Sequence, residues 1–291
     1  MSVLVLAVIA ALVFAVGSVL QQRGAHASAR LVLPHRRRKG LRLANLLLGS
    51  PTWLAGAGLA LCGFGIHATA LHAGSLAVVQ PIQTLTLPAS LLIAGARAHR
   101  IARVDWLGIA SLCGGVAVFL VISAPHDGPP RSRGLLLLVA LVVTGLVALF
   151  WIAGEKAIAS TRGLLLGSAA ALALGLTAAL TKATTSDLAD GGIGHALANW
   201  PLYGLVVAAV AGVGLEQAAF AGAPLATVML PVTLLNPVAA TLMGMLAWHE
   251  RLSSGALAVL VGILAGLALA AVGTSVLSRS PLLQEPPARV R

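Results

Sequence analysis

The sequence predicts an all-α, polytopic membrane protein with about nine transmembrane helices. Of its 291 residues, 58% are hydrophobic and only 9% are charged, and the mean hydropathy is +0.97. Apolar stretches of about 20 residues, long enough to cross a hydrocarbon core of roughly 30 Å as a helix, recur along the chain. Lipid accepts apolar side chains and each helix satisfies its own backbone groups, so we expect one membrane domain over residues 1–276.

Charges, prolines and glycines bound nine apolar segments. The expected helices, in order, are 2–21, 52–71, 75–96, 106–123, 134–153, 163–182, 201–221, 225–247 and 255–276. The boundary signals, in the same order, are Arg23 after the first segment, Pro51 before the second, Gly74 before the third, Pro125 after the fourth, Gly134 opening the fifth, Arg162 before the sixth, Pro201 opening the seventh, Pro224 before the eighth and Gly255 opening the ninth. These residue types are typical of helix ends.

Basic residues alternate between the two sides of the predicted bundle. Fifteen of the 19 Lys and Arg residues fall on one side, after the first, third and fifth helices and in the tail. The positive-inside rule then places the N-terminus outside and the C-terminus in the cytoplasm, so topology explains the net charge of +11 without a nucleic-acid partner. The basic stretch 35–48 is expected to lie against anionic membrane lipid, and the tail 277–291 to be disordered. The other side holds Arg131, Arg133, Lys182 and Arg251.

The two halves of the chain resemble each other. At an offset of 149 residues, GSLAVVQPIQTLTLP (74–88) aligns with APLATVMLPVTLLNP (223–237), and His67 aligns with Glu216. The first and sixth helices align more loosely at an offset of 159, with Arg23 opposite Lys182. We therefore expect a repeat A (2–123), a linker helix (134–153) and a repeat B (163–276) of opposite orientation, an inverted 4+1+4 architecture found in transporters. The alternative is a chance alignment of Ala, Leu and Gly-rich segments.

The repeat, its paired proline helices, the GSLAVVQPI turn and WHERL (248–252) resemble the drug/metabolite transporter (DMT) superfamily, whose domains are often called EamA-like. The stretch 53–121, with HAGSLAVVQPI, also resembles the NIPA-like magnesium-transporter branch of nine crossings. The resemblance implies a carrier of the inner (cell) membrane, and leaves a divalent cation such as magnesium as the alternative cargo.

Acidic and imidazole side chains within apolar segments are the first candidates for a site. A charged side chain in hydrocarbon costs about 2.5–3.5 kcal/mol on insertion scales, so such residues are usually kept for ion or substrate handling. We expect Glu216, beside Gln217, to bind a cation or coupling ion from the cytoplasmic side, with His67 and His72 nearer the outside. The alternative for each is a hydrogen bond that joins helices.

Two prolines define a second candidate region near the membrane midplane. Pro88 and Pro237 each remove a backbone hydrogen bond from a helix, and we expect them to act as hinges. Polar side chains nearby are expected to line a binding pocket in which the repeat mates Thr84 and Thr233 converge; the set is Gln80, Gln83, Thr84, Thr86, Thr227, Thr233 and Asn236. The alternative is that these groups hydrogen-bond neighbouring helices.

Other motifs are assigned structural roles. Gly262 and Gly266 form a GxxxG pair that serves packing within the chain or a homodimer. Trp248, His249 and Glu250 end a helix and are interpreted as an interfacial anchor and cap. Signatures of nucleotide, metal or acyl-transfer chemistry are absent, so we expect no enzyme, cofactor or metal. The leading hypothesis is a secondary-active transporter of a small metabolite or cationic compound working by alternating access; a membrane scaffold or intramembrane enzyme is the alternative.

Overall fold

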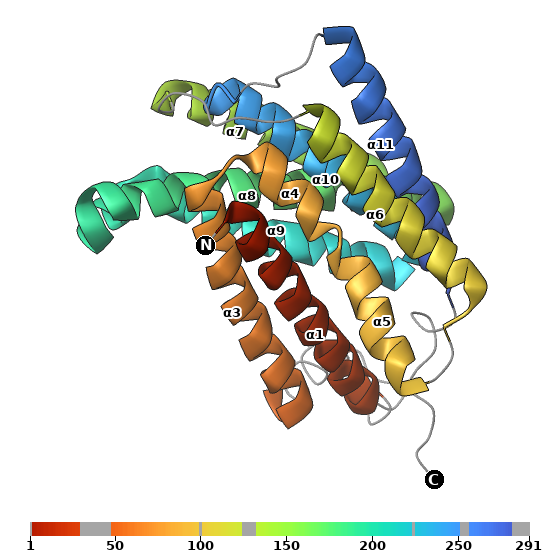
Figure 1. Cartoon of the computed structure of the whole chain (residues 1–291). Helices are drawn as coiled ribbons and strands as arrows, with labels where there is room; N and C mark the ends of the chain where they lie inside the picture. Colours follow the sequence, from red (N-terminus) through yellow and green to blue (C-terminus); the bar gives the residue numbers. More distant parts are fainter. Residues whose placement is uncertain are drawn as a thin grey trace.

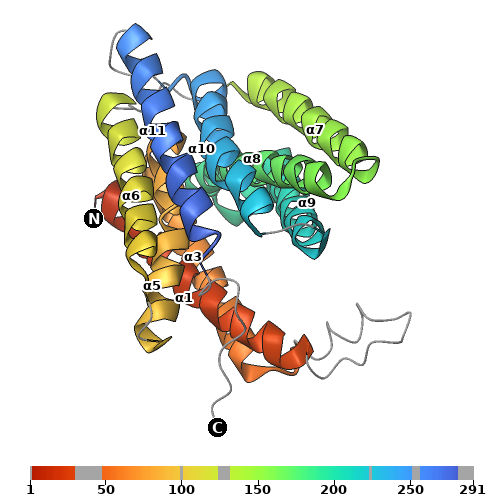
Figure 2. The same ribbon diagram turned by 90° about the vertical axis from the view of Figure 1, so that its right-hand side faces the viewer.

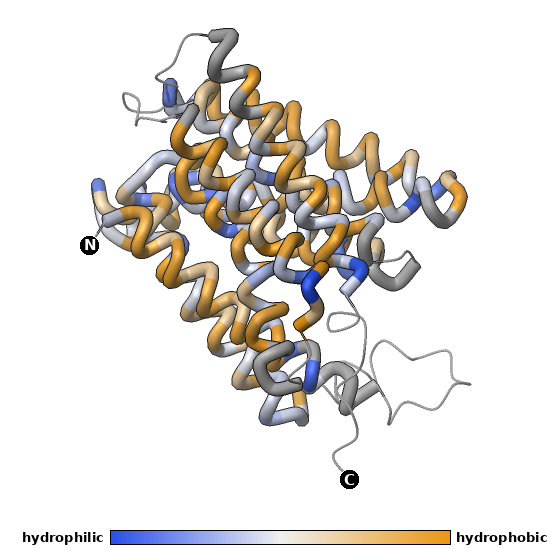
Figure 3. The backbone as a smooth tube through the Cα atoms, turned by 45° about the vertical axis from the view of Figure 1, so that its right-hand side comes forward, coloured by the Kyte–Doolittle hydropathy of each residue, from blue (hydrophilic) through white to orange (hydrophobic). Residues whose placement is uncertain are grey.

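The computed structural model describes residues 2–29, 48–98, 101–123, 132–222, 225–250 and 256–280. Every regular element in these ranges is an α-helix, and eight spans are long and apolar enough to cross a membrane. The tubes in Figure 3 are mostly apolar along their length. The predicted class, an α-helical polytopic membrane protein, is thereby confirmed, whereas the basic stretch 35–47 and the tail after residue 280 lie outside the described residues.

Apart from α1, which continues to Ala29 although its expected end was residue 21, the helices begin and end close to the expected boundaries, with two further exceptions described below. They are α1 (Val3–Ala29), α3 (Pro51–Ala73), α4 (Leu76–Gln83), α5 (Thr86–Ala98), α6 (Arg103–Ser123), α7 (Arg133–Glu155), α8 (Ala159–Ala198), α9 (Trp200–Gly222), α10 (Leu225–Ala247) and α11 (Ala256–Leu277). The helices α4 and α5 together form one span, and the described apolar part of α11, Leu264–Leu277, is shorter than a full span.

The first exception is the helix expected at 75–96, which is two helices in the structure. The α4 helix ends at Gln83, Thr84 and Leu85 form a turn, and α5 begins at Thr86. Pro88 has no N–H to donate to the carbonyl of Thr84 one turn earlier, and its ring crowds that carbonyl. The Thr84 carbonyl accepts from Leu87 N instead, at 3.2 Å. The break therefore lies four residues before Pro88, whereas its repeat mate Pro237 leaves α10 uninterrupted.

The second exception is α8, which was expected to end at residue 182 and continues to Ala198. The polar run beyond Thr177 is helical, and its hydroxyls are satisfied by carbonyls one turn back: Thr181 donates to Thr177 at 2.8 Å and Ser186 donates to Lys182 at 2.9 Å. Only Gly191 and Gly192 depart from helical geometry, Gly192 with a φ of 69°. Lys182 was expected as the last residue of its helix, and it is instead a residue of the helix interior.

Three helix pairs make up most of the packing. The α1 helix packs along α3, α8 along α9, and α6 along α11, while α10 contacts α8, α11 and α4. Figures 1 and 2 both show α6 and α11 side by side at one flank of the molecule, with α7, α8 and α9 grouped at the other. The largest apolar cluster joins α1, α3 and α4 to α7, α8, α9 and α10, and it includes Leu76, Val79, Leu180 and Met243.

The bundle has two distinct ends. We call one the Glu250 end: there the start of α1 meets the end of α3, with Val3 against Gly74, and the start of α4 meets the segment after α10. At the opposite end, Gly24 near the end of α1 lies against Trp53 near the start of α3. An exposed ion pair between Arg162 and Glu155, at 3.0 Å, joins α8 to α7 at that opposite end.

Glycines allow α6 and α11 to touch through their backbones. A Cβ atom on Gly115 would lie 2.5 Å from the Gly266 carbonyl oxygen, and one on Gly273 would lie 2.7 Å from the Gly108 carbonyl oxygen. The earlier glycine of α6 is thus paired with the later glycine of α11, so the two helices are antiparallel. Gly266 therefore packs against another helix of the same chain, which is one of the two uses expected for the GxxxG pair.

Candidate functional site at the half-helix α4

The short helix α4 brings three features together. It is eight residues long, separated from α5 by the turn at Thr84 and Leu85. Residues three apart lie on the same face of a helix, so Gln80 and Gln83 share one face, and Pro81 and Thr84 share the adjacent one. The first of these faces meets α3, the second borders a cavity, and the N-terminus of α4 meets Glu250.

The first feature is a hydrogen-bonded group around His67, which we call the His67 cluster (His67, Gln80 and Gln83). His67 on α3 is 7% exposed. Its ring nitrogens lie 2.9 Å from Gln83 Nε2 and 3.4 Å from Gln80 Nε2, and Phe14 of α1 packs edge-on against the ring. The Gln83 amide also reaches the Ala7 carbonyl of α1 at 3.5 Å. Three of the predicted site residues therefore meet in one buried polar group, while His72 at the end of α3 is exposed.

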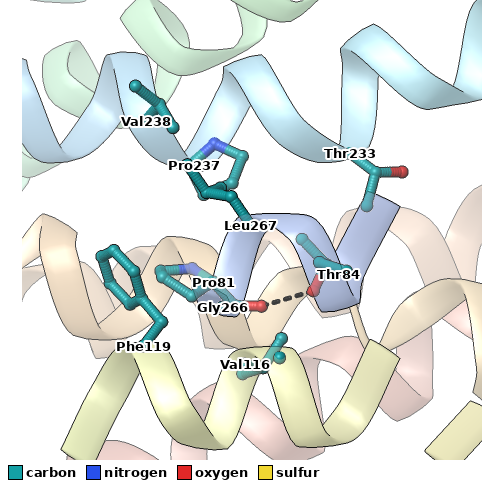
Figure 4. A pocket seen from close by; sticks show the side chains of 11 residues that line it. Pro81, Thr84, Val116, Phe119, Thr233, Pro237, Val238, Gly266 and Leu267 are labelled. Atoms are coloured by element: carbon teal, nitrogen blue, oxygen red, sulfur yellow. Dashed lines mark hydrogen bonds between the residues drawn. The ribbon is translucent and has the colours of Figure 1, made fainter. Parts of the chain in front are cut away.

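The second feature is a small cavity between α4, α6, α10 and α11. Its volume is about 20 Å³, room for about one water molecule. Thr84 and Thr233 both line it, as their repeat relation predicted, together with the rings of Pro81 and Pro237 on either side (Figure 4). The Thr84 hydroxyl donates to the Pro81 carbonyl at 2.6 Å, and the rest of the lining is apolar. The cavity lies beside the crossing of Gly115 and Gly266.

The third feature is a buried carboxylate at the N-terminus of α4. Glu250 is 3% exposed and accepts hydrogen bonds from Leu76 N at 2.9 Å and Ala77 N at 3.2 Å. Lys182 of α8 donates to the same carboxylate at 2.9 Å and lies 5.8 Å from the centre of the Trp248 ring. Buried charges need such partners, because an unpaired charge in an apolar interior costs several kcal/mol.

This arrangement corrects the interpretation of the segment after α10. Trp248 is 6% exposed and Glu250 is 3% exposed, so both are packed inside the protein, and only His249 is exposed. The expected capping role of Glu250 does exist, but the helix that it caps is α4 of the other half. Sequence reasoning missed the role of Lys182 because Lys182 stood at the end of its expected helix, and missed the partners of Glu250 because they lie 68 and 174 residues away.

Other predicted residues lie away from α4. Glu216 is partly buried and Gln217 is exposed on α9, which packs mainly against α8. Among the described residues, Glu216 has no hydrogen-bond or ion-pair partner. Asn236 lies on the side of α10 that faces Gly175 of α8, and its buried Oδ1 has no hydrogen-bond partner in the described part of the chain. Pro88 is buried in α5 outside the cavity, while Pro81, which no prediction named, lines it.

Metal-ligating side chains do not gather at any described position. The described ranges contain no group of three or more His, Cys, Asp or Glu residues able to hold a metal ion. The two cysteines, Cys62 and Cys113, are free, and both are exposed on the helix surface. The chemistry that the half-helix offers is hydrogen bonding and charge neutralisation.

Comparison with known proteins yields one informative relative. A protein of Corynebacterium glutamicum, described only as uncharacterized, is 29% identical to this chain over 259 residues. The alignment spans 84% of this chain and 89% of the relative, so it runs through most of the helices of both. No protein-family profile matches the chain, and no solved structure matches it.

Proposed function

We propose that this protein is a secondary-active transporter of the drug/metabolite transporter type that moves a small metabolite or cationic compound by alternating access. The observation that carries the proposal is the half-helix α4, which borders a cavity on one face and a buried polar cluster on the next. Interrupted helices at the contact between two halves are a recurring feature of carriers, because freed backbone groups and half-helix ends bind substrate or ions there. A passive scaffold has no need of such a break.

An internal two-fold relation supports the proposal. In a symmetric contact, residue i touches residue j and the mate of j touches the mate of i. Gly115 meets Gly266 and Gly108 meets Gly273, which is this pattern when α6 and α11 are aligned at an offset of 158 residues, nine more than the offset of 149 in the preceding helices. The pairing of α1 with α3 is repeated by α8 with α9. Because α6 and α11 are antiparallel, the axis between them lies in the membrane plane, as an inverted repeat requires.

The same proposal assigns an orientation and a membrane. The loops at the opposite end carry most of the basic residues, so we place that end in the cytoplasm and the Glu250 end outside, with the cell membrane as the location. The reassignment of Lys182 to a helix interior removes one positive charge from the outer loops and strengthens this bias. The N-terminus is then outside and the C-terminus cytoplasmic.

Residue roles follow from position. The cavity at Thr84 and Thr233 is the occluded remnant of the substrate site, and the His67 cluster lies on the adjacent face of α4, against α3. Glu216, a carboxylate on an apolar helix, is the candidate for ion coupling. Exchange of Glu216 for Gln is expected to abolish the dependence of transport on the ion gradient; unchanged rate and unchanged pH dependence would remove Glu216 from the mechanism.

Magnesium transport is the second candidate, and it rests on the resemblance of residues 53–121 to the NIPA-like branch. A Mg²⁺ path offers several oxygen ligands, usually carboxylates and water. The only carboxylate in contact with α4 in the described ranges is Glu250, which Lys182 already neutralises. The donor set therefore favours an organic substrate over a bare divalent ion.

Cysteine accessibility tests for a water-filled path. In a variant with Cys62 and Cys113 replaced by Ala, Thr84→Cys is expected to react with a membrane-impermeant maleimide from at least one side of the membrane. Leu61→Cys is the control, because Leu61 is 74% exposed in the middle of α3, where lipid excludes the reagent. If Thr84→Cys and Thr233→Cys stay unreactive from both sides, the cavity never opens and the proposal fails.

Flux in proteoliposomes separates the remaining alternatives. The purified protein is expected to produce uptake or charge movement for at least one member of a panel of amino acids, small metabolites and organic cations. Uptake of Mg²⁺ alone, followed with an internal magnesium dye, would establish the second candidate. Reactive cysteines in the cavity together with chemical conversion of a lipid would instead indicate an intramembrane enzyme.

A further inference from the structure

We propose that Glu250 is a latch that holds the Glu250 end of the transporter closed by binding the N-terminus of α4. The inference rests on the proposed function, and it adds a residue, a mechanism of closure and a resting conformation. The latch consists of three contacts: the carboxylate of Glu250 with Leu76 N, with Ala77 N and with Lys182 Nζ.

The latch joins the two halves of the chain. Glu250 and Lys182 belong to the second half, whereas Leu76 and Ala77 open the half-helix of the first. The backbone N–H groups in the first turn of a helix have no partner within the helix, and a carboxylate there is also favoured by the helix dipole. Opening this end separates α4 from Glu250, so it leaves two amide groups without their acceptor and uncovers the ion pair between Glu250 and Lys182. Closure at this end is stabilised by contacts that only the closed form makes.

Space around the carboxylate is filled. A Cβ atom on Gly244 would lie 2.7 Å from the Glu250 carboxyl carbon, and Trp248 covers Lys182 from the other side. The Glu250 carboxylate is therefore closely packed, and water does not reach its ion pair with Lys182. Charge-assisted hydrogen bonds that are shielded in this way are about twice as strong as neutral ones.

In the ranges that the structure describes, no carboxylate at the opposite end caps a helix of the other half. Under the repeat offset of 149, Leu76 corresponds to Leu225 and Glu250 corresponds to Ile101, which has no carboxylate. The acid nearest to Ile101 is Asp105, which is already bound to Ala102 N of its own segment at 3.0 Å. Two halves that are alike in fold therefore differ in what closes their ends. This difference favours a resting state that is closed at the Glu250 end. The protein then opens first at the opposite end.

Two kinds of variant test the latch, both in the protein without Cys62 and Cys113 and with Thr84→Cys as the reporter. Glu250→Gln removes the charge. Leu76→Pro removes one donor N–H and keeps both charges; proline suits the first position of a helix, and Ser75 before it is already extended, with φ of −74° and ψ of 149°. Leu76→Val is the matched control, because valine has the same number of side-chain carbons as proline and keeps the N–H.

The readout is the rate of maleimide labelling in intact cells, from the Glu250 side, and in inverted vesicles, from the opposite side. Glu250→Gln and Leu76→Pro are expected to raise labelling from the Glu250 side by about tenfold or more, the effect of losing one hydrogen bond to a charged group. Leu76→Val is expected to label at the parent rate. If Glu250→Gln does not fold, the double variant Lys182→Met with Glu250→Gln removes both charges and takes its place. The comparison of Leu76→Pro with Leu76→Val also tests the latch by itself.

The outcomes separate the latch from the proposed function. If Leu76→Pro and Glu250→Gln label no faster than Leu76→Val from the Glu250 side, while Thr84→Cys reacts from the opposite side, the latch is wrong and the carrier stands. If Thr84→Cys reacts from neither side in any variant, there is no path to gate and both proposals fail. Faster labelling in both variants and from the Glu250 side alone establishes the latch.

Discussion

The crossing of α6 and α11 gives the sharpest prediction about how this fold is held together. Gly115 and Gly114 are neighbours on α6, but only Gly115 faces α11. A Cβ atom on Gly115 would lie 2.5 Å from the Gly266 carbonyl oxygen and 2.7 Å from Ala270 N, whereas one on Gly114 would meet nothing within 4 Å. The exchanges Gly115→Ala and Gly114→Ala therefore add the same methyl group to one helix, in two different environments.

The magnitude follows from these distances. Both close atoms belong to the backbone, so no side-chain rotation relieves the contact, and the two helices must separate locally by about 0.5–0.9 Å to restore a distance of 3.0–3.4 Å. A gap of about 0.5–1 Å forfeits a quarter to a half of the van der Waals attraction, and overpacking of this kind costs about 1–3 kcal/mol. The gain of about 1 kcal/mol in helix propensity is common to both variants. Gly115→Ala is expected to be less stable than Gly114→Ala by about 1–3 kcal/mol.

Thermal unfolding in detergent, followed by the fluorescence of the five tryptophans, measures this difference. On the scale of a domain of about 200 residues, each kcal/mol lowers the Tm by about 2–4 °C. Gly115→Ala should therefore unfold several degrees below Gly114→Ala, and Gly114→Ala should match or exceed the parent protein. Equal Tm values for the two variants would refute the close approach of α6 and α11, and with it the support that their crossing gives to the two-fold relation.

Three further predictions use the same thermal assay. Lys182→Met leaves the Glu250 charge buried without its ion-pair partner, so it should destabilise the fold by about 3–5 kcal/mol, and adding Glu250→Gln should recover part of the loss; a double variant no better than the single one would contradict this. His67→Leu removes the partner of the Gln83 amide and should cost about 1–3 kcal/mol; a Tm equal to that of the parent would show that Gln83 needs no partner there. Arg162→Met loses an exposed ion pair with Glu155 and should change stability by less than about 1 kcal/mol, so a larger loss would reveal an unexpected structural role.

Helix positions were largely predictable, and their exceptions have local causes. Apolar segments between charges and prolines gave the boundaries of α7 and α10 to within two residues, because a membrane-spanning segment must be continuous, apolar and helical to satisfy its backbone. The break at Thr84 was not predicted from Pro88, because the hydrogen bond that a proline cannot donate is missing at the carbonyl one turn earlier in the chain. The length of α8 was underestimated because its Ser and Thr hydroxyls bond within the helix.

The candidate site was predictable in part. The repeat relation placed Thr84 and Thr233 together, and both line one cavity. Gln80, Gln83 and His67 were named separately and meet because α3 and α4 are joined by a short turn. Glu216 drew attention as an acid in an apolar segment, yet the acid that contacts α4 is Glu250, which by sequence ends a helix.

The sequence by itself determined the class of protein and the run of helices, since hydropathy and boundary residues are properties of short segments. Only the tertiary structure decided which charges are buried together and which glycines meet. Lys182 and Glu250 are 68 residues apart, and Glu250 reaches amide groups 174 residues away. Nothing local marks such partners, because a buried charge is tolerated only where the packing of distant helices supplies its counter-charge and hydrogen-bond donors.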